Sequence, residues 1–362
     1  MWRRRDDIRR RPLDDLNPRR ILLIKPSALG DVVQTLPLLT ALRERWPEAH
    51  ISWVIKESLA DILSGHPQLD EVITYDDRAK SVRYAGVLAG LWLRLRKVPY
   101  DLAIDVQGLM RSGGMALASR AGRRVGFSTA REGAGYVYTD EIQVPTLQMP
   151  VLSRYWLIAH ALGLSPSVSS AQLGLTDTHR EWAAEKLRDL PRPILAVHPG
   201  AKWETKSWPA GHFAELSRRA AAAHGAGIVL LGGPAIASQC EEVAAAAPDR
   251  TLNLAGQTTL RELAALSNAA DAFLSCDSGP MHLAAALGTP VVGVFTCTSP
   301  LRSAPHGDGH QSVQTDVSCA GSYLRTCPHM QCMSELTPDR VWPALNQTLS
   351  SLSVEHPAAR AC

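Results

Sequence analysis

Four short segments place reactive side chains directly after apolar runs that are predicted to be strands. The first segment follows the run at residues 21–25 and ends in Gly30 and Asp31. A carboxylate presented there can serve as the general base of a group-transfer reaction. The same side chain can instead cap the following helix by accepting backbone N–H groups, and the spacing leaves both interpretations open.

Two lysines stand in the second segment, residues 198–209, between a predicted strand and a predicted helix. Lys202 and Lys206 could neutralise phosphate oxygens, because a lysine ammonium binds phosphate as a compact point charge. Exposed loop lysines are also common, so a solvated loop without a ligand is the alternative.

The third segment, Gly232 and Gly233, either lets a ligand approach the backbone closely or is simply a loop.

The fourth segment, residues 275–282, runs from a predicted strand into a predicted helix and contains Asp277, Ser278, Gly279 and His282. Ser278 and Gly279 stand at the start of that helix, where unpaired N–H groups and the helix dipole favour an anion. Asp277 could bind ribose hydroxyls or cap the helix, and His282 could reach a phosphate or simply pack. The segment indicates either a diphosphate site or an ordinary helix start.

Several common nucleotide and metal motifs are missing from the sequence. No predicted strand is followed by G-x-G-x-x-G, and there is no G-x-x-x-x-G-K-[ST] loop. No D-x-D carboxylate pair occurs, so a metal-bridged diphosphate has no support, and we expect neither a metal nor a cofactor. Lys206 and the helix start at Ser278 would take the place of the metal.

All seven cysteines lie after residue 239, and their odd number without a signal sequence argues for reduced thiols. Cys319, Cys327 and Cys332 lie near His329, but the spacing between the first two cysteines misses the usual zinc pairing. We do not expect a zinc site, and the role of these three cysteines stays open.

Short apolar runs alternate with helical patterns along the whole chain, which predicts an α/β fold. The first series of expected strands covers residues 21–25, 51–55, 72–75, 101–106 and 124–127. The second series covers residues 194–197, 228–231, 252–254, 271–275 and 291–295. Two such series predict two doubly wound, Rossmann-like domains facing across a cleft, with ligands at the carboxyl ends of the strands.

A polar, turn-rich stretch at residues 164–178 is the expected linker between the two series. We therefore predict a flexible basic leader over residues 1–18 and an N-terminal domain over residues 19–167. The C-terminal domain is expected over residues 168–362.

Charge is uneven along the chain. Residues 1–180 hold 25 Lys and Arg against 19 Asp and Glu, whereas residues 181–362 hold 13 against 16. The basic half indicates an anionic partner, such as a phosphorylated substrate, an acidic sugar or a membrane surface, rather than nucleic acid.

The helix expected at 80–97 ends in a basic cluster, and its apolar stripe is interpreted as core rather than membrane-seeking. Without a signal-peptide core or a transmembrane stretch, we expect a cytoplasmic protein.

The four segments, in this order, resemble those of the family 9 glycosyltransferases, the lipopolysaccharide heptosyltransferases. The resemblance spans about residues 21 to 345 and rests on ILLIKPSALGDVVQTLPLLTAL (21–42), YDLAIDVQGLMRSG (100–113), HPGAKWETKSWP (198–209) and LAGQTTLRELAALSNAADAFLSCDSGPMHLAAALGTPVVGVF (254–295). It implies a two-domain GT-B enzyme that inverts configuration without a metal. Its reaction would move heptose from ADP-L-glycero-D-manno-heptose, a substrate rather than a cofactor, to the Kdo or inner-core region of lipopolysaccharide.

The resemblance also implies roles for individual residues. Asp31 matches the catalytic carboxylate, and Lys206 matches a lysine that contacts the donor phosphates. The donor-binding turn of the family is matched by Asp277, Ser278, Gly279 and His282, and a nucleotide contact is expected at Thr258. A non-catalytic sugar-binding or nucleotide-binding module is disfavoured, because Asp31 and Lys206 are both present.

The acceptor is indicated by motifs of the first half. ISWVIKE (51–57), DVQGLMRS (105–112) and TAREGA (129–134) look more like the heptosyltransferase I type, which acts on Kdo-lipid A. Arg131 and Arg154 would then face an anionic glycolipid, and the enzyme could sit peripherally on the inner face of the cytoplasmic membrane. The basic leader and the cysteine segment look foreign to that type. The alternative is a family member that uses another nucleotide sugar or a later core acceptor.

Overall fold

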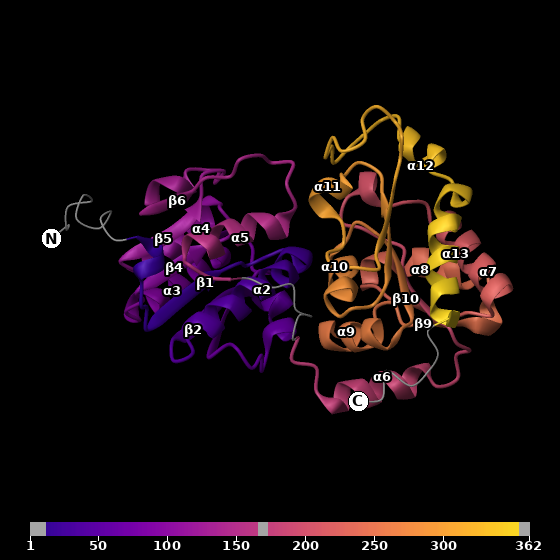
Figure 1. The fold of residues 1–362 in the computed structure, drawn as a ribbon, viewed down its shortest axis with the longest axis horizontal. Coiled ribbons are helices and arrows are strands. Elements are labelled where there is room, and N and C mark those ends of the chain that lie inside the picture. Colours follow the sequence, from indigo (N-terminus) through magenta and orange to yellow (C-terminus); the bar gives the residue numbers. More distant parts are fainter. Residues whose placement is uncertain (1–11, 166–172, 355–362) are drawn as a thin grey trace. The chain divides into compact units, whose positions relative to one another are not determined.

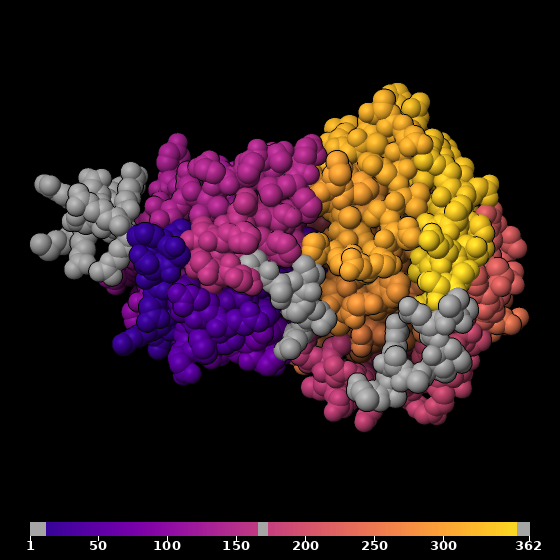
Figure 2. All heavy atoms as spheres, in the orientation of Figure 1, coloured from indigo at the N-terminus to yellow at the C-terminus, as the bar shows by residue number. Residues whose placement is uncertain are grey.

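The computed structural model describes residues 12–165 and 173–354, and Figure 1 and Figure 2 draw the rest of the chain in grey. The chain divides into two compact units, Met1–Gly174 and Leu175–Cys362. The boundary expected between residues 167 and 168 lies outside the described residues, and so do residues 1–11 of the expected leader. The end of that leader forms a short 3-10 helix, η1 (Leu13–Asp15), and the Trp46 indole donates a hydrogen bond to the Leu16 carbonyl at 3.2 Å.

The first unit contains a parallel sheet of six strands in the order β3-β2-β1-β4-β5-β6 (Figure 1). The strands are β1 (Arg20–Ile24), β2 (His50–Lys56), β3 (Glu71–Tyr75), β4 (Leu102–Asp105), β5 (Arg123–Phe127) and β6 (Asp140–Ile142). Residues 21–24 of β1 are fully buried. Such continuous burial is typical of a parallel strand that is covered on both faces.

Helices cover the two faces of this sheet in pairs. On one face α3 (Ser81–Lys97) contacts α4 (Met110–Ala118), and both contribute to a core beneath them. α2 (Leu29–Arg45) contacts α5 (Val151–Ala161) on the other face. This arrangement follows because the sheet extends from β1 in two opposite directions and the crossovers between its parallel strands are right-handed. The remaining helices of this unit are the 3-10 helices η2 (Glu57–Leu63) and η3 (Ala134–Val137).

The second unit repeats this arrangement with a parallel sheet in the order β12-β11-β10-β7-β8-β9. The strands are β7 (Ile194–His198), β8 (Gly227–Leu230), β9 (Thr251–Asn253), β10 (Ala272–Cys276), β11 (Val291–Phe295) and β12 (Gln311–Gln314). One core joins the sheet to α7, α8 and α13, while α9 contacts both α6 and α10. These and the other helices are α6 (Asp177–Leu187), η4 (Glu204–Lys206), α7 (Ala210–His224), η5 (Pro234–Ile236), α8 (Ala237–Ala244), η6 (Pro248–Arg250), α9 (Leu260–Ala269), α10 (Gly279–Ala286), α11 (Pro300–Ser303), α12 (Gln331–Glu335) and α13 (Pro338–Val354).

Both sheets follow the strand order 3-2-1-4-5-6 of a doubly wound nucleotide-binding fold, counted from the first strand of each unit. The order reverses between β1 and β4 in the first unit and between β7 and β10 in the second. The α/β class with two Rossmann-like domains is therefore confirmed. In open sheets of this kind, ligands bind beyond the carboxyl ends of the strands at the point of reversal.

Ten of the strands lie where the apolar runs predict them, and β6 and β12 are additional. The additional strands have the sequences DEI and QSVQ and lie at sheet edges, where polar residues are tolerated. Among residues 12–165 and 173–354, no helix combines the length and the apolar character needed to cross a membrane.

Candidate active site

Asp31 lies in the first turn of α2, which follows β1. The helix begins at Leu29 with Ala28 as its N-cap residue, so Asp31 is the third residue of the helix and caps it from there rather than from the N-cap position. Its carboxylate oxygen Oδ2 accepts a hydrogen bond from the Ala28 N–H at 3.2 Å, and its side chain is 36% exposed. Asp31 thus supports the helix start with one oxygen while the carboxylate stays open to solvent.

Lys25, which the sequence analysis did not single out, is the cationic neighbour of Asp31. Its Nζ lies 3.5 Å from Asp31 Oδ2 and 5.8 Å from the centre of the Tyr155 ring on α5, and its side chain is buried. Burial works against the charged form, but Asp31 and Tyr155 outweigh it, so the pKa of Lys25 is raised. A permanently charged ammonium therefore faces the Asp31 carboxylate from inside the unit.

Asp105 ends β4, the strand next to β1, and its Cα is paired with that of Ile24. Its carboxylate accepts hydrogen bonds from the Gly108 N–H at 3.0 Å and the Tyr138 hydroxyl at 2.7 Å. Burial nevertheless raises the pKa of Asp105. A Cβ at Gly126 would lie 2.2 Å from the Tyr138 ring, so glycine there lets the tyrosine reach Asp105. Asp105 is fully buried, and the hydrogen bond that it accepts from the Gly108 N–H organises the loop after β4.

The two arginines matched to the acceptor site lie in different parts of the first unit. Arg131 is exposed, and its backbone N–H donates to the Gly108 carbonyl at 2.8 Å, in the loop after β4. Arg154 is partly buried on α5 beside Tyr155. Burial raises the pKa of Tyr155, whereas the charges of Lys25 and Arg154 oppose that shift. Arg154 therefore belongs to the same electrostatic environment as Lys25.

Lys206 and Asp277 form an ion pair in the second unit. Lys206 Nζ lies 2.9 Å from Asp277 Oδ2, and His282 Nε2 lies 3.7 Å from Asp277 Oδ1. Burial would raise the pKa of Asp277, but the neighbouring His282 ring and the Lys206 charge outweigh it and lower the pKa to about 2. Asp277 is therefore ionised at every physiological pH and holds the Lys206 ammonium and the His282 ring.

Ser278 is the N-cap residue of α10 and Gly279 is the first residue of that helix. The Ser278 hydroxyl makes no capping hydrogen bond and lies 2.9 Å from the Ser275 hydroxyl instead. The first N–H groups of a helix have no partner within the helix itself. The helix start therefore offers N–H donors beside the Lys206–Asp277 pair, as a site for an anion requires.

Trp203 and Arg325 extend this cluster, although no sequence pattern singles out either residue. The Trp203 ring has Lys206 Nζ at 5.1 Å and the Arg325 guanidinium carbon at 4.9 Å from its centre. Arg325 comes from the loop before α12, which is tied down because the Thr205 hydroxyl donates to the Leu324 carbonyl at 2.7 Å. No sequence pattern could have found this contact, because the loop lies far along the chain.

The two remaining residues predicted for the donor site come from the loop after β7 and the loop before α9. Lys202 is exposed in the loop after β7. Thr258 is partly exposed and immediately precedes Thr259, the N-cap residue of α9. Gly232 has a packing role, because a Cβ there would lie 2.3 Å from Ile236.

Two further histidines of the second unit have lowered pKa values. His198 ends β7 and is buried, and burial lowers its pKa to about 4, so its ring is neutral at pH 7. The pKa of His306 is lowered by burial and then by the charge of His282. In the part of the chain that the structure describes, no three His, Cys, Asp or Glu side chains are grouped as metal ligands.

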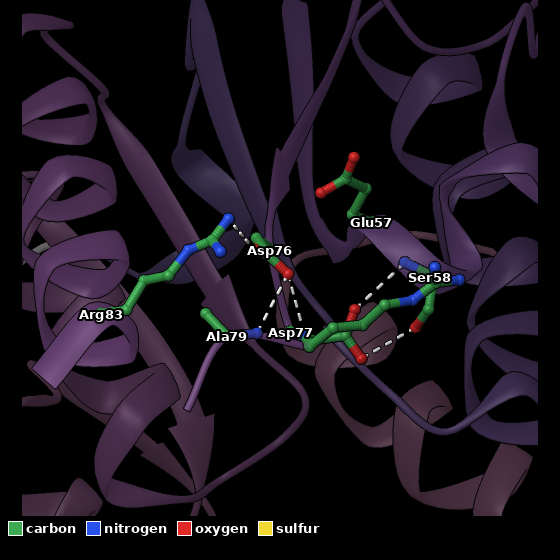
Figure 3. A pocket seen from close by; sticks show the side chains of 7 residues that line it. Glu57, Ser58, Asp76, Asp77, Ala79 and Arg83 are labelled. Carbon is green, nitrogen blue, oxygen red and sulfur yellow. Dashed lines mark hydrogen bonds and ion pairs between the residues drawn. The ribbon is translucent and has the colours of Figure 1, made fainter. Parts of the chain in front are cut away.

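A pocket of about 390 Å³ lies elsewhere in the first unit, beyond β2 and β3 (Figure 3). Asp76 accepts hydrogen bonds from the Ala79 N–H and Arg83, and Asp77 accepts from Ser58. These carboxylates are already paired, and the pocket contains none of the predicted site residues. Its lining consists of Glu57, Ser58, Asp76, Asp77, Arg78, Ala79 and Arg83.

Comparison with known proteins identifies the family. The chain is 28% identical to the lipopolysaccharide core heptosyltransferase OpsX of Haemophilus influenzae, over 93% of this chain and 98% of that protein. It is 30% identical to lipopolysaccharide heptosyltransferase 1 of Pseudomonas aeruginosa, over 91% and 98%. The solved structure of the Escherichia coli ADP-heptose lipopolysaccharide heptosyltransferase II superposes with a TM-score of 0.75 at 25% identity, over 92% of this chain and 99% of that one. The sequence model of glycosyltransferase family 9 (heptosyltransferase) matches residues 88–333, and the chain belongs to that family of transferases.

Proposed function

We propose that this protein transfers heptose from ADP-L-glycero-D-manno-heptose to the Kdo or inner-core region of lipopolysaccharide, with inversion and without a metal. The relatives are by name lipopolysaccharide heptosyltransferases, and one is named for ADP-heptose. The observation that carries the proposal is the contact of Lys206 with Asp277 beside the start of α10. This contact places a cation next to the N–H donors of the helix start, and the phosphate groups of a sugar diphosphate are bound by groups of both kinds.

The donor site belongs to the second unit. Lys206 and the N–H groups at Ser278 and Gly279 receive the diphosphate and stabilise the negative charge that develops on the departing ADP. Asp277 orients Lys206 and His282 and takes no part in proton transfer. Arg325 adds a second positive charge, and contacts with the nucleotide are assigned to Lys202 and Thr258. The nucleotide sugar is a substrate, and no cofactor is invoked.

The catalytic base belongs to the first unit. The acceptor hydroxyl oxygen attacks the anomeric carbon, the bond from that carbon to the diphosphate oxygen breaks, and the hydroxyl proton moves to Asp31. Lys25 holds the Asp31 carboxylate in place, and one displacement of this kind inverts the anomeric centre. Arg131 and Arg154 bind the anionic groups of the acceptor. Because that acceptor is a lipid, the protein would work in the cytoplasm at the inner face of the membrane.

Mass spectrometry of Kdo-lipid A, incubated with the purified protein and ADP-heptose, tests the proposal. One added heptose with the unaltered protein, and none with Asp31→Ala, is the expected result. If no mass is added to Kdo-lipid A, a panel of nucleotide sugars and later core acceptors follows. Transfer in that panel would assign the protein to the alternative within the family and reject Kdo-lipid A as its acceptor.

A further inference from the structure

The outer face of α3 is apolar, although it faces solvent. Val82 is 87% exposed, Leu93 is 57% exposed and Trp92 is 36% exposed. A Cβ built at Gly86 or Gly90 would have no heavy atom within 4 Å, so none of the residues that the structure describes covers the middle of the helix. Because a helix repeats every 3.6 residues, one continuous stripe is formed by Val82, Ala85, Gly86, Ala89, Gly90 and Leu93.

The fold does not need this stripe. The inner face of α3 already anchors the helix, because Leu91 and Leu95 are buried in the core of the first unit. Tyr84, Val87 and Leu88 pack against the same core. A surface helix with a filled inner face ordinarily carries polar residues on its outer face. The outer stripe therefore exposes apolar surface that folding alone does not explain.

Positive charge borders the stripe. α3 contains Arg83, Arg94, Arg96 and Lys97 and no acidic residue. Arg94 is paired with Glu71 at 2.7 Å, whereas the Arg96 guanidinium lies 4.8 Å from the centre of the exposed Trp92 ring. An arginine stacked on tryptophan at the end of an apolar stripe combines a charged group with an interfacial aromatic ring. This combination is typical of helices that lie in the headgroup region of a bilayer.

We propose that the outer face of α3 docks onto an anionic lipid bilayer, with Val82 and Leu93 entering the interface and Arg96 and Lys97 contacting headgroups. A second copy of the chain is a poor occupant, because a symmetric contact would bring two sets of these cations together. The proposal deepens the proposed function and rests on it for its purpose, which is to bring the transferase to a lipid acceptor. The stripe expected to be core, at residues 84, 87, 88, 91 and 95, does pack in the core, and the docking surface is the opposite face of the helix.

Sedimentation of the full chain with vesicles tests the proposal without donor or acceptor. The unaltered protein should bind vesicles of phosphatidylcholine and phosphatidylglycerol and bind pure phosphatidylcholine far more weakly. The double variant Val82→Glu/Leu93→Glu should lose affinity for the anionic vesicles by about tenfold or more, because two apolar anchors become repelled charges. Arg96→Gln/Lys97→Gln should lose less and should become less sensitive to salt.

Leu301→Glu is the matched control, because Leu301 is 70% exposed on α11 and lies outside the proposed surface. Thermal melting should show that every variant is folded, as is expected for exposed positions. A protein that lacks residues 2–11 tests the basic leader. The proposal is overturned if the unaltered protein ignores anionic vesicles, if Val82→Glu/Leu93→Glu binds normally, or if Leu301→Glu loses as much. Vesicle binding that depends on residues 2–11 and not on α3 would overturn it as well.

A second assay separates this proposal from the proposed function. Transfer of heptose to a detergent-solubilised acceptor should be the same for Val82→Glu/Leu93→Glu and the unaltered protein, whereas transfer to acceptor in vesicles should fall. If neither protein transfers heptose but vesicle binding follows α3, the proposed function fails and the docking surface stands. If transfer occurs and vesicle binding ignores α3, only the docking surface fails.

Discussion

The Lys206 ammonium and the Asp277 carboxylate are 2.9 Å apart, although they follow different strands, β7 and β10. These strands are neighbours at the point where the order of the second sheet reverses, and Ser275 of β10 is paired with His198 of β7. The fold therefore brings both loops to one place before any ligand binds. A lysine ammonium has three donors, so Lys206 can keep its bond to Asp277 and still bind a phosphate oxygen.

Lys206→Ala should weaken the binding of ADP by about 10- to 100-fold, the range expected for losing a charge-assisted hydrogen bond. Isothermal titration calorimetry with ADP measures this change directly. Lys186→Ala is the matched control, because Lys186 also lies over a tryptophan, Trp182, but is exposed on α6. Equal ADP affinity in Lys206→Ala and the unaltered protein would remove Lys206 from the donor site.

Asp31→Asn should lower kcat by about 10²- to 10⁴-fold, the usual contribution of a general base. The amide oxygen of asparagine can still accept the Ala28 N–H, so the start of α2 should remain intact. Affinity for ADP should stay within about twofold, because the donor site belongs to the other unit. Turnover with a fixed donor concentration, together with ADP titration, checks both statements. Glu44→Gln on the same helix should be fully active, and a similar activity for Asp31→Asn would exclude its role as the base.

Much of the fold could be predicted from the sequence, because ten strands are short apolar runs whose carboxyl ends meet in a doubly wound sheet. That rule also predicts that Lys206 and Asp277 lie together. The start of α2 was harder, because Ala28 has no capping side chain to mark it. Lys25 and Arg325 could not be predicted, since their partners Tyr155 and Trp203 come from remote segments and depend on tertiary packing.

The depressed pKa of Asp277 predicts a specific loss of stability in acid. A carboxyl group with a lowered folded-state pKa stabilises the fold above its unfolded pKa of 3.8, and the stabilisation disappears as pH falls through about 2. Between pH 6 and pH 3 the unaltered protein should therefore lose about 1 kcal/mol more unfolding free energy than Asp277→Asn. Urea unfolding of both proteins across this range measures the difference. Parallel pH curves for the two proteins would show that the carboxylate is not held by Lys206 and His282 in solution.

Arg325→Ala should weaken ADP binding by about 2- to 5-fold, because its guanidinium lies over Trp203 beside Lys206 and adds positive charge at the donor site. Arg250→Ala, an exposed arginine of the same unit, should leave ADP affinity unchanged. Because Lys206 and Arg325 share one indole ring, their effects should not add in the double variant Lys206→Ala/Arg325→Ala. Calorimetric ADP affinities of the two single variants and the double variant give this coupling. Strict additivity would show that the two cations act independently, and an unchanged affinity in Arg325→Ala would limit the donor site to Lys206 and the start of α10.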